Sequence, residues 1–167
     1  KEPSAVYKTL KEFNTGWIQF IPIVNHDLEG NVSEESITGL EYGEFLCNIF
    51  DQWILNDVGK LNIQIIAETI LVLMGGTTNL CQLSPECGRV LVVEHDGNVY
   101  SCDHFVTPKN LLGNFLTQDI GKLVDSKQQI TFGRNKSKGL SSKCKACNWL
   151  ALCYGGCPKN RFVSIGA

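Results

Sequence analysis

The stretch "KCKACNWLALCYGGCPKNRF", residues 143–162, holds Cys144, Cys147, Cys153 and Cys157, separated by two, five and three residues. Thiols this close together serve as zinc ligands, as iron–sulfur cluster ligands or as disulfide partners. The chain has eight cysteines in 167 residues, and all except Cys47 fall after residue 80. No secretion signal precedes them, so the clustering indicates metal before disulfides.

The spacing of these thiols leaves the identity of the metal open. Cys144 and Cys147 form a zinc knuckle, although the step to Cys153 is shorter than the usual spacer between two knuckles. The glycines at 155 and 156 suit the close backbone approach that a cluster requires around Cys157. Zinc and an iron–sulfur cluster both remain compatible with the pattern, and disulfides are less favoured.

Three further thiols lie upstream, in a turn and at the end of a predicted hairpin. Cys81 and Cys87 flank the turn "CQLSPEC", and Cys102 ends the alternating stretch "RVLVVEHDGNVYSC". The dipeptide Asp96-Gly97 predicts a two-residue hairpin turn. A symmetric turn there places Cys102 opposite Leu91. The three thiols can converge if the proline turn folds back over the hairpin, and a fourth ligand must then come from elsewhere.

The first half of the chain alternates predicted strands and helices. A helix begins near Ser4. A strand buried on both faces ("WIQFIPIV"), an amphipathic helix, an alternating strand and a short helix follow, at residues 17–24, 41–56, 61–66 and 67–74. This order is typical of βα units in a parallel sheet or barrel. Two strands cannot close a barrel, so the pattern indicates the tail of a larger α/β domain.

The character of the chain changes after Thr77. Behind the hairpin we expect a turn at Gly113-Asn114, a short helix near residues 119–125 and then the polar segment 133–142. The expected fold class is therefore α+β. Cys47 lies off the apolar stripe of its helix and is interpreted as a free thiol without a special role.

Composition excludes several classes of partner. The net charge of −2 gives no basis for binding nucleic acid, and the longest apolar run, near residues 70–74, is far shorter than a membrane span. We therefore expect a cytoplasmic protein that binds neither nucleic acid nor membrane.

The seven clustered cysteines resemble a known motif. The run Cys87-x9-Gly97-x4-Cys102, then Cys144-x2-Cys147-x5-Cys153-x3-Cys157, is similar to that of SPASM domains, the C-terminal extension of many radical SAM enzymes that modify peptides. The words "YSCDHF", "LLGNF" and "CYGGCPKNRF", with "IQFIPIV" and "YGEFLCNIFDQW", resemble the anaerobic sulfatase-maturating enzymes. The resemblance implies the last βα units of a radical SAM partial barrel over residues 1–76 and a SPASM domain over 77–167.

The resemblance also implies two auxiliary [4Fe–4S] clusters. The first would be bound by Cys81, Cys87, Cys102 and Cys157, and the second by Cys144, Cys147 and Cys153. In the family, the fourth ligand of the second cluster lies further along the chain than Ala167. The CxxxCxxC loop that binds a third [4Fe–4S] cluster and S-adenosylmethionine is also absent from this sequence, so this portion alone should be inactive.

The catalytic residue that the resemblance implies is Asp103, next to Cys102. In the family this Asp is implicated as the base that deprotonates the side chain of a sulfatase Cys or Ser during its oxidation to formylglycine. The partners implied are a sulfatase polypeptide and an electron donor or acceptor protein. Without the resemblance, Asp103 is interpreted as a cap of the turn after the hairpin.

The remaining polar candidates have ordinary interpretations. His104 is expected to have a structural role, and His26 and His95 are expected to face water. Lys159 and Arg161 can offset cluster charge or meet substrate, although a solvated basic segment is the commoner arrangement. Two alternative functions stay open: a SPASM maturase of ribosomal peptides, and a zinc-stabilised interaction module without catalysis.

Overall fold

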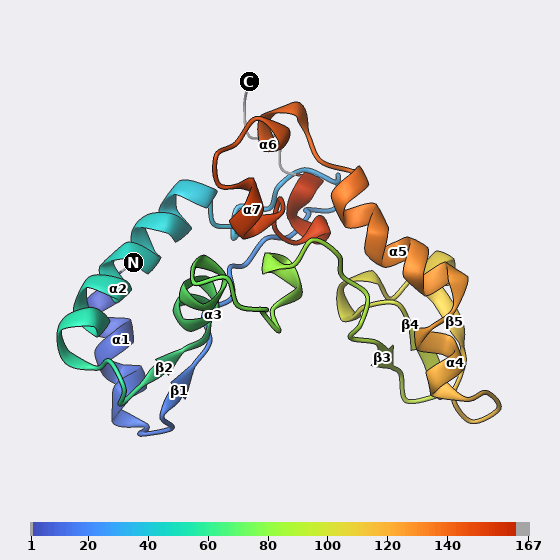
Figure 1. The fold of residues 1–167 in the computed structure, drawn as a ribbon, viewed down its shortest axis with the longest axis horizontal. Coiled ribbons are helices and arrows are strands. Elements are labelled where there is room, and N and C mark those ends of the chain that lie inside the picture. The colour runs from blue at the N-terminus through green and yellow to red at the C-terminus, as the bar shows by residue number, and fades with distance from the viewer. Residues whose placement is uncertain (1, 163–167) are drawn as a thin grey trace. The chain divides into compact units, whose positions relative to one another are not determined.

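The computed structural model describes residues 2–162, in two units with the bounds Lys1–Gly76 and Thr77–Ala167 (Figure 1). Both units mix helices with a small sheet, as the predicted α+β class requires. Among the described residues no helix has the length and apolar character that crossing a membrane demands.

The first unit consists of three helices and two short parallel strands. In chain order these are α1 (Pro3–Glu12), β1 (Trp17–Ile18), α2 (Gly39–Asn56), β2 (Asn62–Ile63) and α3 (Gln64–Leu73). Strand β1 pairs with β2 in the parallel direction, with Trp17 opposite Asn62 and Ile18 opposite Ile63. A helix between two parallel strands is the βα arrangement that the sequence predicts.

The core of this unit is apolar and lies between the helices and the strand pair. Its buried members are Tyr7, Ile18, Ile49, Trp53, Ile63 and Ile66. Helix α2 contributes two of them from its apolar face. A capping box fixes its first turn, because Thr38 accepts a hydrogen bond from the amide of Glu41 while the Glu41 carboxylate accepts one from the amide of Thr38.

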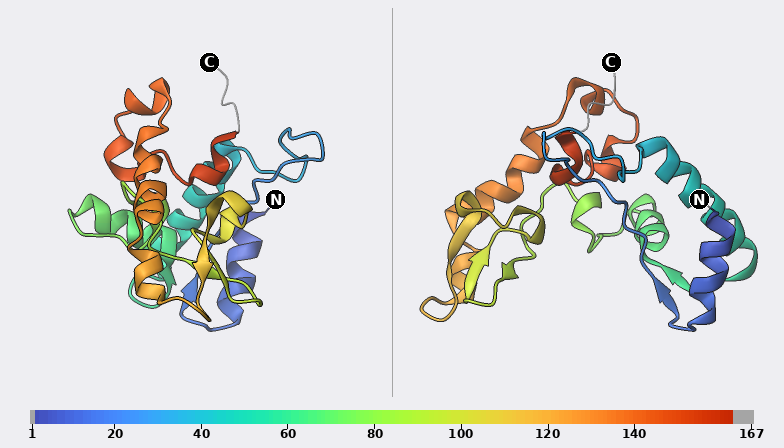
Figure 2. Two further views of the ribbon diagram at one scale, coloured as in Figure 1. Left: turned by 90° about the vertical axis from the view of Figure 1, so that its right-hand side faces the viewer. Right: turned by 180° about the vertical axis from the view of Figure 1, so that it is seen from behind.

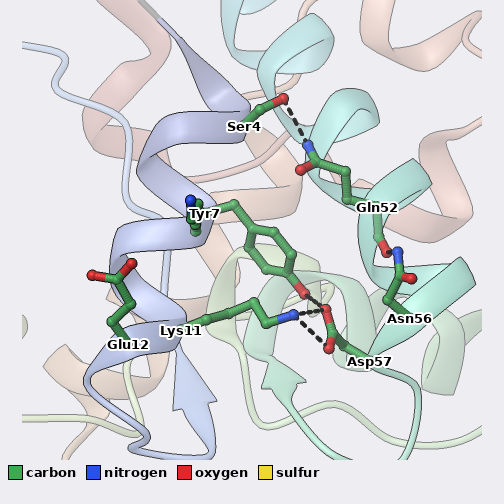
Figure 3. A pocket seen from close by; sticks show the side chains of 8 residues that line it. Ser4, Tyr7, Lys11, Glu12, Gln52, Asn56 and Asp57 are labelled. Carbon is green, nitrogen blue, oxygen red and sulfur yellow. Dashed lines mark hydrogen bonds and ion pairs between the residues drawn. The ribbon is translucent and has the colours of Figure 1, made fainter.

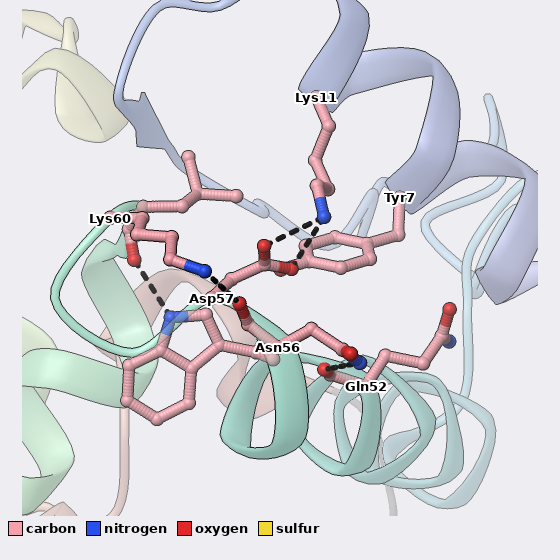
Figure 4. A network of polar contacts seen from close by, with 8 residues as sticks. Tyr7, Lys11, Gln52, Asn56, Asp57 and Lys60 are labelled. Atoms are coloured by element: carbon pink, nitrogen blue, oxygen red, sulfur yellow. Dashed lines mark hydrogen bonds and ion pairs between the residues drawn. The ribbon is translucent and has the colours of Figure 1, made fainter.

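A buried polar contact ties α1 to the end of α2 (Figures 3 and 4). The Tyr7 hydroxyl donates to Oδ2 of Asp57 at 2.7 Å, and Nζ of Lys11 donates to both carboxylate oxygens at 2.7 Å. Burial by itself raises the pKa of Asp57, but the hydrogen bonds from Lys11 and Tyr7 outweigh it and hold that pKa below its usual value. Asp57 is therefore an ionised anchor between two helices.

Three predictions in this unit need correction. The run over residues 17–24 is not one strand buried on both faces: pairing ends at Ile18, because the partner strand β2 ends at Ile63 where α3 begins, and Ile21 is 69% exposed. For the same reason, residues 64–66 belong to α3. Helix α1 begins at Pro3 rather than at a Ser4 cap, since proline is preorganised for the first helical position.

The second unit has a three-stranded antiparallel sheet and several short helical segments. The strands are β3 (Val92–Val93), β4 (Asn98–Tyr100) and β5 (Leu111–Asn114), in the order β3-β4-β5. The α-helices are α4 (Ile120–Val124), α5 (Lys127–Lys138), α6 (Ser142–Lys145) and α7 (Leu150–Cys153). The 3₁₀ segments are η1 (Cys81–Leu83), η2 (Asp103–Phe105), η3 (Pro108–Asn110) and η4 (Pro158–Phe162).

The hairpin between β3 and β4 has a three-residue turn instead of the predicted two-residue turn. The amide of Glu94 donates to the Asn98 carbonyl and the amide of Gly97 donates to the Glu94 carbonyl, both at 2.9 Å. Gly97, with φ of +85°, supplies the left-handed residue that completes a type I turn with a bulge. The register moves by one residue, so in continuation Leu91 faces Ser101 rather than Cys102.

Helix α5 includes residues 133–138 of the segment that the sequence identifies only as polar, and it lies beside the sheet (Figures 1 and 2). Its buried positions are Gln129, Gly133 and Lys136. These residues follow the spacing of one helical face, but none is an apolar side chain, so the hydrophobic period gives no signal. The predicted turn at Gly113-Asn114 is also wrong, since both residues belong to β5.

Candidate metal centre

The proposed ligands of the first cluster come from three separate chain segments of the second unit. Cys81 opens η1 with Cys87 in the following loop, Cys102 stands between β4 and η2, and Cys157 lies between α7 and η4. Helix α7 packs against η1. Sγ of Cys157 lies 3.6 Å from Nδ1 of His104, which is two residues beyond Cys102. The segment that holds Cys157 therefore lies beside the segment that holds Cys102, and the helix before Cys157 packs against the segment that begins at Cys81.

The thiols of this set influence one another electrostatically. Burial raises the pKa of Cys81, and the nearby Cys157 raises it further. The pKa of Cys87 is raised by burial and then by Cys81. Burial, followed by contact with Asp103 and the charge of Cys157, raises the pKa of Cys102 to about 12. Cys81, Cys87 and Cys102 are thus thiols whose ionisation is disfavoured by burial and by neighbouring groups, and such a donor set is one that a cation would deprotonate and hold.

Helix α5 holds the loops that carry two of these cysteines. Nε2 of Gln129 donates to the carbonyl of Gly88 and, at 3.0 Å, to the carbonyl of Ser101, so one buried side chain joins the neighbours of Cys87 and Cys102. One turn further, the carbonyl of Gly133 accepts a hydrogen bond from the Cys87 amide at 3.3 Å. A Cβ at position 133 would lie 2.1 Å from the Cys87 carbonyl oxygen, so only glycine allows this approach.

Lys136 holds the remaining loop from the same face of α5. Its Nζ donates to the carbonyls of Cys81 at 2.6 Å and Gln82 at 3.0 Å, and to that of Ser84. The side chain is only 1% exposed. An ammonium group has three donors, and here three backbone carbonyls accept them. The η1 loop is thereby folded around a buried positive charge.

Arg161 extends this connection to the segment that contains Cys157. Its Nη1 donates to the Lys136 carbonyl at 2.7 Å, and Nε and Nη2 each donate at 3.2 Å, to the carbonyls of Gly155 and Tyr154. Those two residues and Gly156 have left-handed backbone, with φ of 46° at Tyr154, 75° at Gly155 and 65° at Gly156. The consecutive left-handed residues turn the chain from α7 towards Cys157.

The proposed ligands of the second cluster lie on the short helices α6 and α7. Cys144 is within α6, where Ser141 caps its amide at 3.2 Å, and Sγ of Cys147 accepts a hydrogen bond from the Trp149 amide at 3.4 Å. Cys153 ends α7. Within residues 2–162, neither the sulfurs of Cys144, Cys147, Cys153 and Cys157 nor those of Cys81, Cys87, Cys102 and Cys157 include three that lie within 4.8 Å of one another. The ligand atoms that do meet this limit belong to Cys102, Asp103 and His104.

Asp103 stands at the edge of the centre and is exposed to solvent. Its Oδ1 accepts a hydrogen bond from the Cys102 thiol at 3.1 Å and from the amide of His104 at 3.0 Å. The bond from Cys102 lowers the pKa of Asp103. The carboxylate is therefore ionised near neutral pH, with one oxygen engaged locally, which is compatible both with a turn-capping role and with a base.

The basic residues of this region differ from their sequence interpretation. Arg161 is half-buried against three carbonyls and is not part of a solvated segment. Lys136 and Gln129 are not predicted as site residues from the sequence, because a polar residue in a polar stretch produces no recognisable hydrophobic period or motif. Their one available signal was the spacing of residues 129, 133 and 136, which matches a helical face. His26 and His95 are exposed, as predicted.

Comparison with known proteins gives this cysteine framework a family. Residues 81–148 match the SPASM family, described as an iron-sulfur cluster-binding domain. The match includes five of the seven clustered cysteines, and Cys153 and Cys157 follow it directly. Residues 81–148 are thus similar to a SPASM domain. The resemblance to SPASM domains that the cysteine spacing suggested is confirmed.

The similarity extends through both units. The chain is 39% identical to a serine-type anaerobic sulfatase-maturating enzyme of Bacteroides thetaiotaomicron, over 96% of this chain and 42% of that protein. A cysteine-type anaerobic sulfatase-maturating enzyme of Clostridium perfringens is 31% identical over 93% of this chain and 43% of its own length. The chain is thus homologous to the anaerobic sulfatase-maturating enzymes, and it spans less than half the length of these relatives.

A solved structure supports the same relationship at the level of the fold. The structure described as native anSMEcpe with bound AdoMet and Kp18Cys peptide matches with a TM-score of 0.79 and 28% identity. The match covers 98% of this chain and 46% of that one. The mixed helix and sheet architecture of both units is therefore that of a radical SAM sulfatase-maturating enzyme.

Proposed function

We propose that this chain is part of a radical SAM enzyme that oxidises the active-site Cys or Ser of a sulfatase to formylglycine. The observation that carries the proposal is similarity to serine-type and cysteine-type maturases across more than nine-tenths of the chain. In this proposal, residues 1–76 are the last βα units of the radical SAM barrel, and residues 77–167 are the domain that binds auxiliary clusters. S-adenosylmethionine and its own cluster would bind to a part of the enzyme outside this sequence.

The proposed ligand sets follow the cysteine framework. Cys81, Cys87, Cys102 and Cys157 would bind the first auxiliary [4Fe–4S] cluster, and Cys144, Cys147 and Cys153 would supply three ligands of the second. The mutual influence of the first four thiols supports this grouping. They do not need to lie within reach of one ion, because each thiolate of a four-iron cluster binds a different iron. When bound, such a cluster supplies a one-electron acceptor.

Asp103 is the proposed catalytic base. Formation of formylglycine removes a hydrogen atom from Cβ, a proton from the hydroxyl or thiol, and one further electron. The serine product is then the aldehyde, whereas the cysteine product is a thioaldehyde that water converts to the aldehyde with release of hydrogen sulfide. A carboxylate that is ionised and exposed is in the correct state to accept that proton.

The direct test uses the full-length protein, reconstituted anaerobically and supplied with a reductant, S-adenosylmethionine and synthetic sulfatase peptides that carry Cys or Ser. The expected result is a peptide aldehyde, detected by mass spectrometry and by capture with a hydrazine. S-adenosylmethionine cleavage without aldehyde, or with a crosslinked peptide, would instead indicate a maturase of ribosomal peptides. Stoichiometric zinc that iron does not replace would indicate an interaction module.

The variant Asp103→Asn tests the role of the carboxylate. It keeps the size of the side chain and an oxygen that can accept the His104 amide, but it lacks the basicity needed to take a proton. We expect aldehyde formation to fall ~10²-fold or more, the typical contribution of a general base, with iron and sulfide contents unchanged. Turnover at the original rate would remove Asp103 from the mechanism and leave it as a turn cap. The matched control is Asp119→Asn, which changes a helix cap on the same unit.

A further inference from the structure

The buried face of α5 carries a cation that the proposed reaction does not use. Lys136 is 1% exposed, and its ammonium group is bonded to the carbonyls of Cys81, Gln82 and Ser84. A buried lysine normally has a carboxylate partner, because burial disfavours its charged form. Here burial lowers the pKa of Lys136, while the nearby Cys81, Cys87 and Cys157 act against that shift and three backbone carbonyls accept its hydrogen bonds.

The contacts of Lys136 form a continuous connection between two ligand segments. Its side chain holds the loop that begins at Cys81, while its own carbonyl accepts Nη1 of Arg161. Arg161 in turn holds the carbonyls of Tyr154 and Gly155, just before Cys157. Cys81 and Cys157 are far apart in sequence, so two buried or half-buried cations set the distance between their backbones.

We propose that Lys136 and Arg161 are positioning residues of the first cluster: they clamp the Cys81 and Cys157 segments in a ligand-ready arrangement and place two fixed positive charges beside the four thiolates. This inference rests on the proposed cluster assignment and goes beyond it. A cluster bound by four thiolates has a net negative charge that becomes more negative on reduction. A fixed cation nearby therefore stabilises the reduced form and raises the reduction potential.

The chemistry of the clamp explains why the two cations differ. Lysine offers three donors from one point, which fits three carbonyls that converge from one short loop. Arginine offers donors along a planar fork, which fits carbonyls from separate residues on two segments. Position 155 is also restricted, because a Cβ there would lie 2.4 Å from a methyl carbon of Leu140 and 3.1 Å from the Arg161 guanidinium. The backbone at Gly155 therefore packs directly against the Arg161 guanidinium, and a side chain at position 155 would displace it.

The test compares Lys136→Met with Lys138→Met in the full-length protein. Both changes remove one positive charge from the end of α5, but Lys138 is exposed to solvent. After anaerobic reconstitution, iron and sulfide are assayed and the potentials of the clusters are measured by titration followed by electron paramagnetic resonance. We expect Lys136→Met to assemble the first cluster less completely and to shift its potential to a more negative value, with Lys138→Met matching the unchanged protein.

A second variant keeps the inference testable if Lys136→Met does not fold. Arg161→Met loses a half-buried charge and three hydrogen bonds to carbonyls, and should shift the same potential in the same direction. A merely structural role would lower the iron content without moving the potential of the clusters that do form. The clamp is overturned if either folded variant keeps the original iron content and potentials. If the unchanged full-length protein cleaves S-adenosylmethionine but holds the iron of one cluster alone, the auxiliary-cluster assignment fails while the radical SAM function survives; if it holds no iron and cleaves no S-adenosylmethionine, the proposed function fails as well.

Discussion

The two units bury different kinds of side chain. In the first unit the completely buried side chains are those of Ile49 and Ile63, within a larger apolar core. In the second unit Val99 is accompanied by Ser101, Gln129 and Lys136 among the described residues. Burying an aliphatic side chain stabilises a fold by ~1.5–3 kcal/mol, whereas a satisfied hydrogen bond contributes ~1 kcal/mol net. The first unit therefore owes more of its stability to the exclusion of water.

The comparison gives a physical reason to expect that folding of the second unit depends on a bound metal or cluster. Polar side chains that hold backbone carbonyls specify where the Cys81, Cys87 and Cys102 loops lie, but they add little net stability. A metal or cluster that binds only the folded ligand set contributes its binding free energy to folding. In the second unit, specificity comes from α5 and stability is expected to come from the bound cofactor.

The largest expected effect is that of removing the metal. Chelation and oxidative loss of the clusters should abolish most amide protection in residues 77–162, because folding there is coupled to metal binding. Residues 2–76 should keep their protection. Hydrogen exchange followed by mass spectrometry separates the two units by peptide, and readdition of iron and sulfide is the control that should restore the pattern. Equal protection of both units without metal would contradict the comparison.

A cavity in the apolar core should produce the opposite result. Ile49→Ala removes a completely buried side chain from α2 and should destabilise the first unit by ~2–5 kcal/mol. The iron content of the second unit should not change. Leu55→Ala is the control on the same helix, since Leu55 is 82% exposed and its loss should cost less than ~0.5 kcal/mol. Denaturant unfolding gives the free energy of unfolding of each variant, and an iron assay on the same samples gives the iron content. A loss of iron in Ile49→Ala would contradict the expectation that the two units are stabilised separately.

A smaller effect is expected from one methyl group on α5. Gly133→Ala favours the helix by ~1 kcal/mol in intrinsic propensity, but the new Cβ would lie 2.1 Å from the Cys87 carbonyl oxygen, and relief of that overlap costs ~1–3 kcal/mol. We expect a net loss of stability and less iron, because the Cys87 loop must move. Gly139→Ala is the control, since its Cβ meets nothing closer than 3.4 Å. Full iron content in Gly133→Ala would show that the close approach is not required.

These contrasts also account for what the sequence predicts and what it does not. The apolar stripe of α2 and the parallel strand order are visible from hydrophobic periodicity, because the first unit is built on an apolar core. Helix α5 escapes the same method, since Gln129, Gly133 and Lys136 are what it buries. Periodicity of apolar residues cannot detect a face whose partners are backbone carbonyls.

The residues of the candidate site also differ in whether the sequence identifies them. The seven cysteines are recognisable because the chemistry of a cluster fixes both residue type and spacing. The predicted hairpin register is wrong by one residue. An Asp-Gly dipeptide fits a two-residue turn, but it also fits a three-residue turn in which the glycine is the third, left-handed residue, as Gly97 is here. Lys136 and Arg161 have no local signal, since their partners are carbonyls from segments distant in the chain. Only tertiary structure reveals such contacts.

The smallest expected effect concerns the polar contact of the first unit, which differs from those of α5 in being a conventional ion pair. Tyr7→Phe removes one hydrogen bond to Asp57 and should lower the free energy of unfolding of the first unit by ~1 kcal/mol.

The same contact should make the stability of the first unit depend on pH. Because the pKa of Asp57 is lowered in the folded state, the stabilisation by its carboxylate is complete above the usual Asp pKa of ~3.9 and disappears as the pH falls through the lower folded value. The stability of the first unit should therefore fall on acidification more steeply in the unchanged protein than in Asp57→Asn, which has no carboxylate to protonate. Urea unfolding between pH 7 and the acid range measures the difference when it is followed by tryptophan fluorescence in a protein with Trp149→Phe, which leaves Trp17 and Trp53 of the first unit as the reporters. Asp51→Asn on the exposed side of α2 is the matched control. Parallel curves for the unchanged protein and Asp57→Asn would mean that the carboxylate adds no pH-dependent stability to this unit.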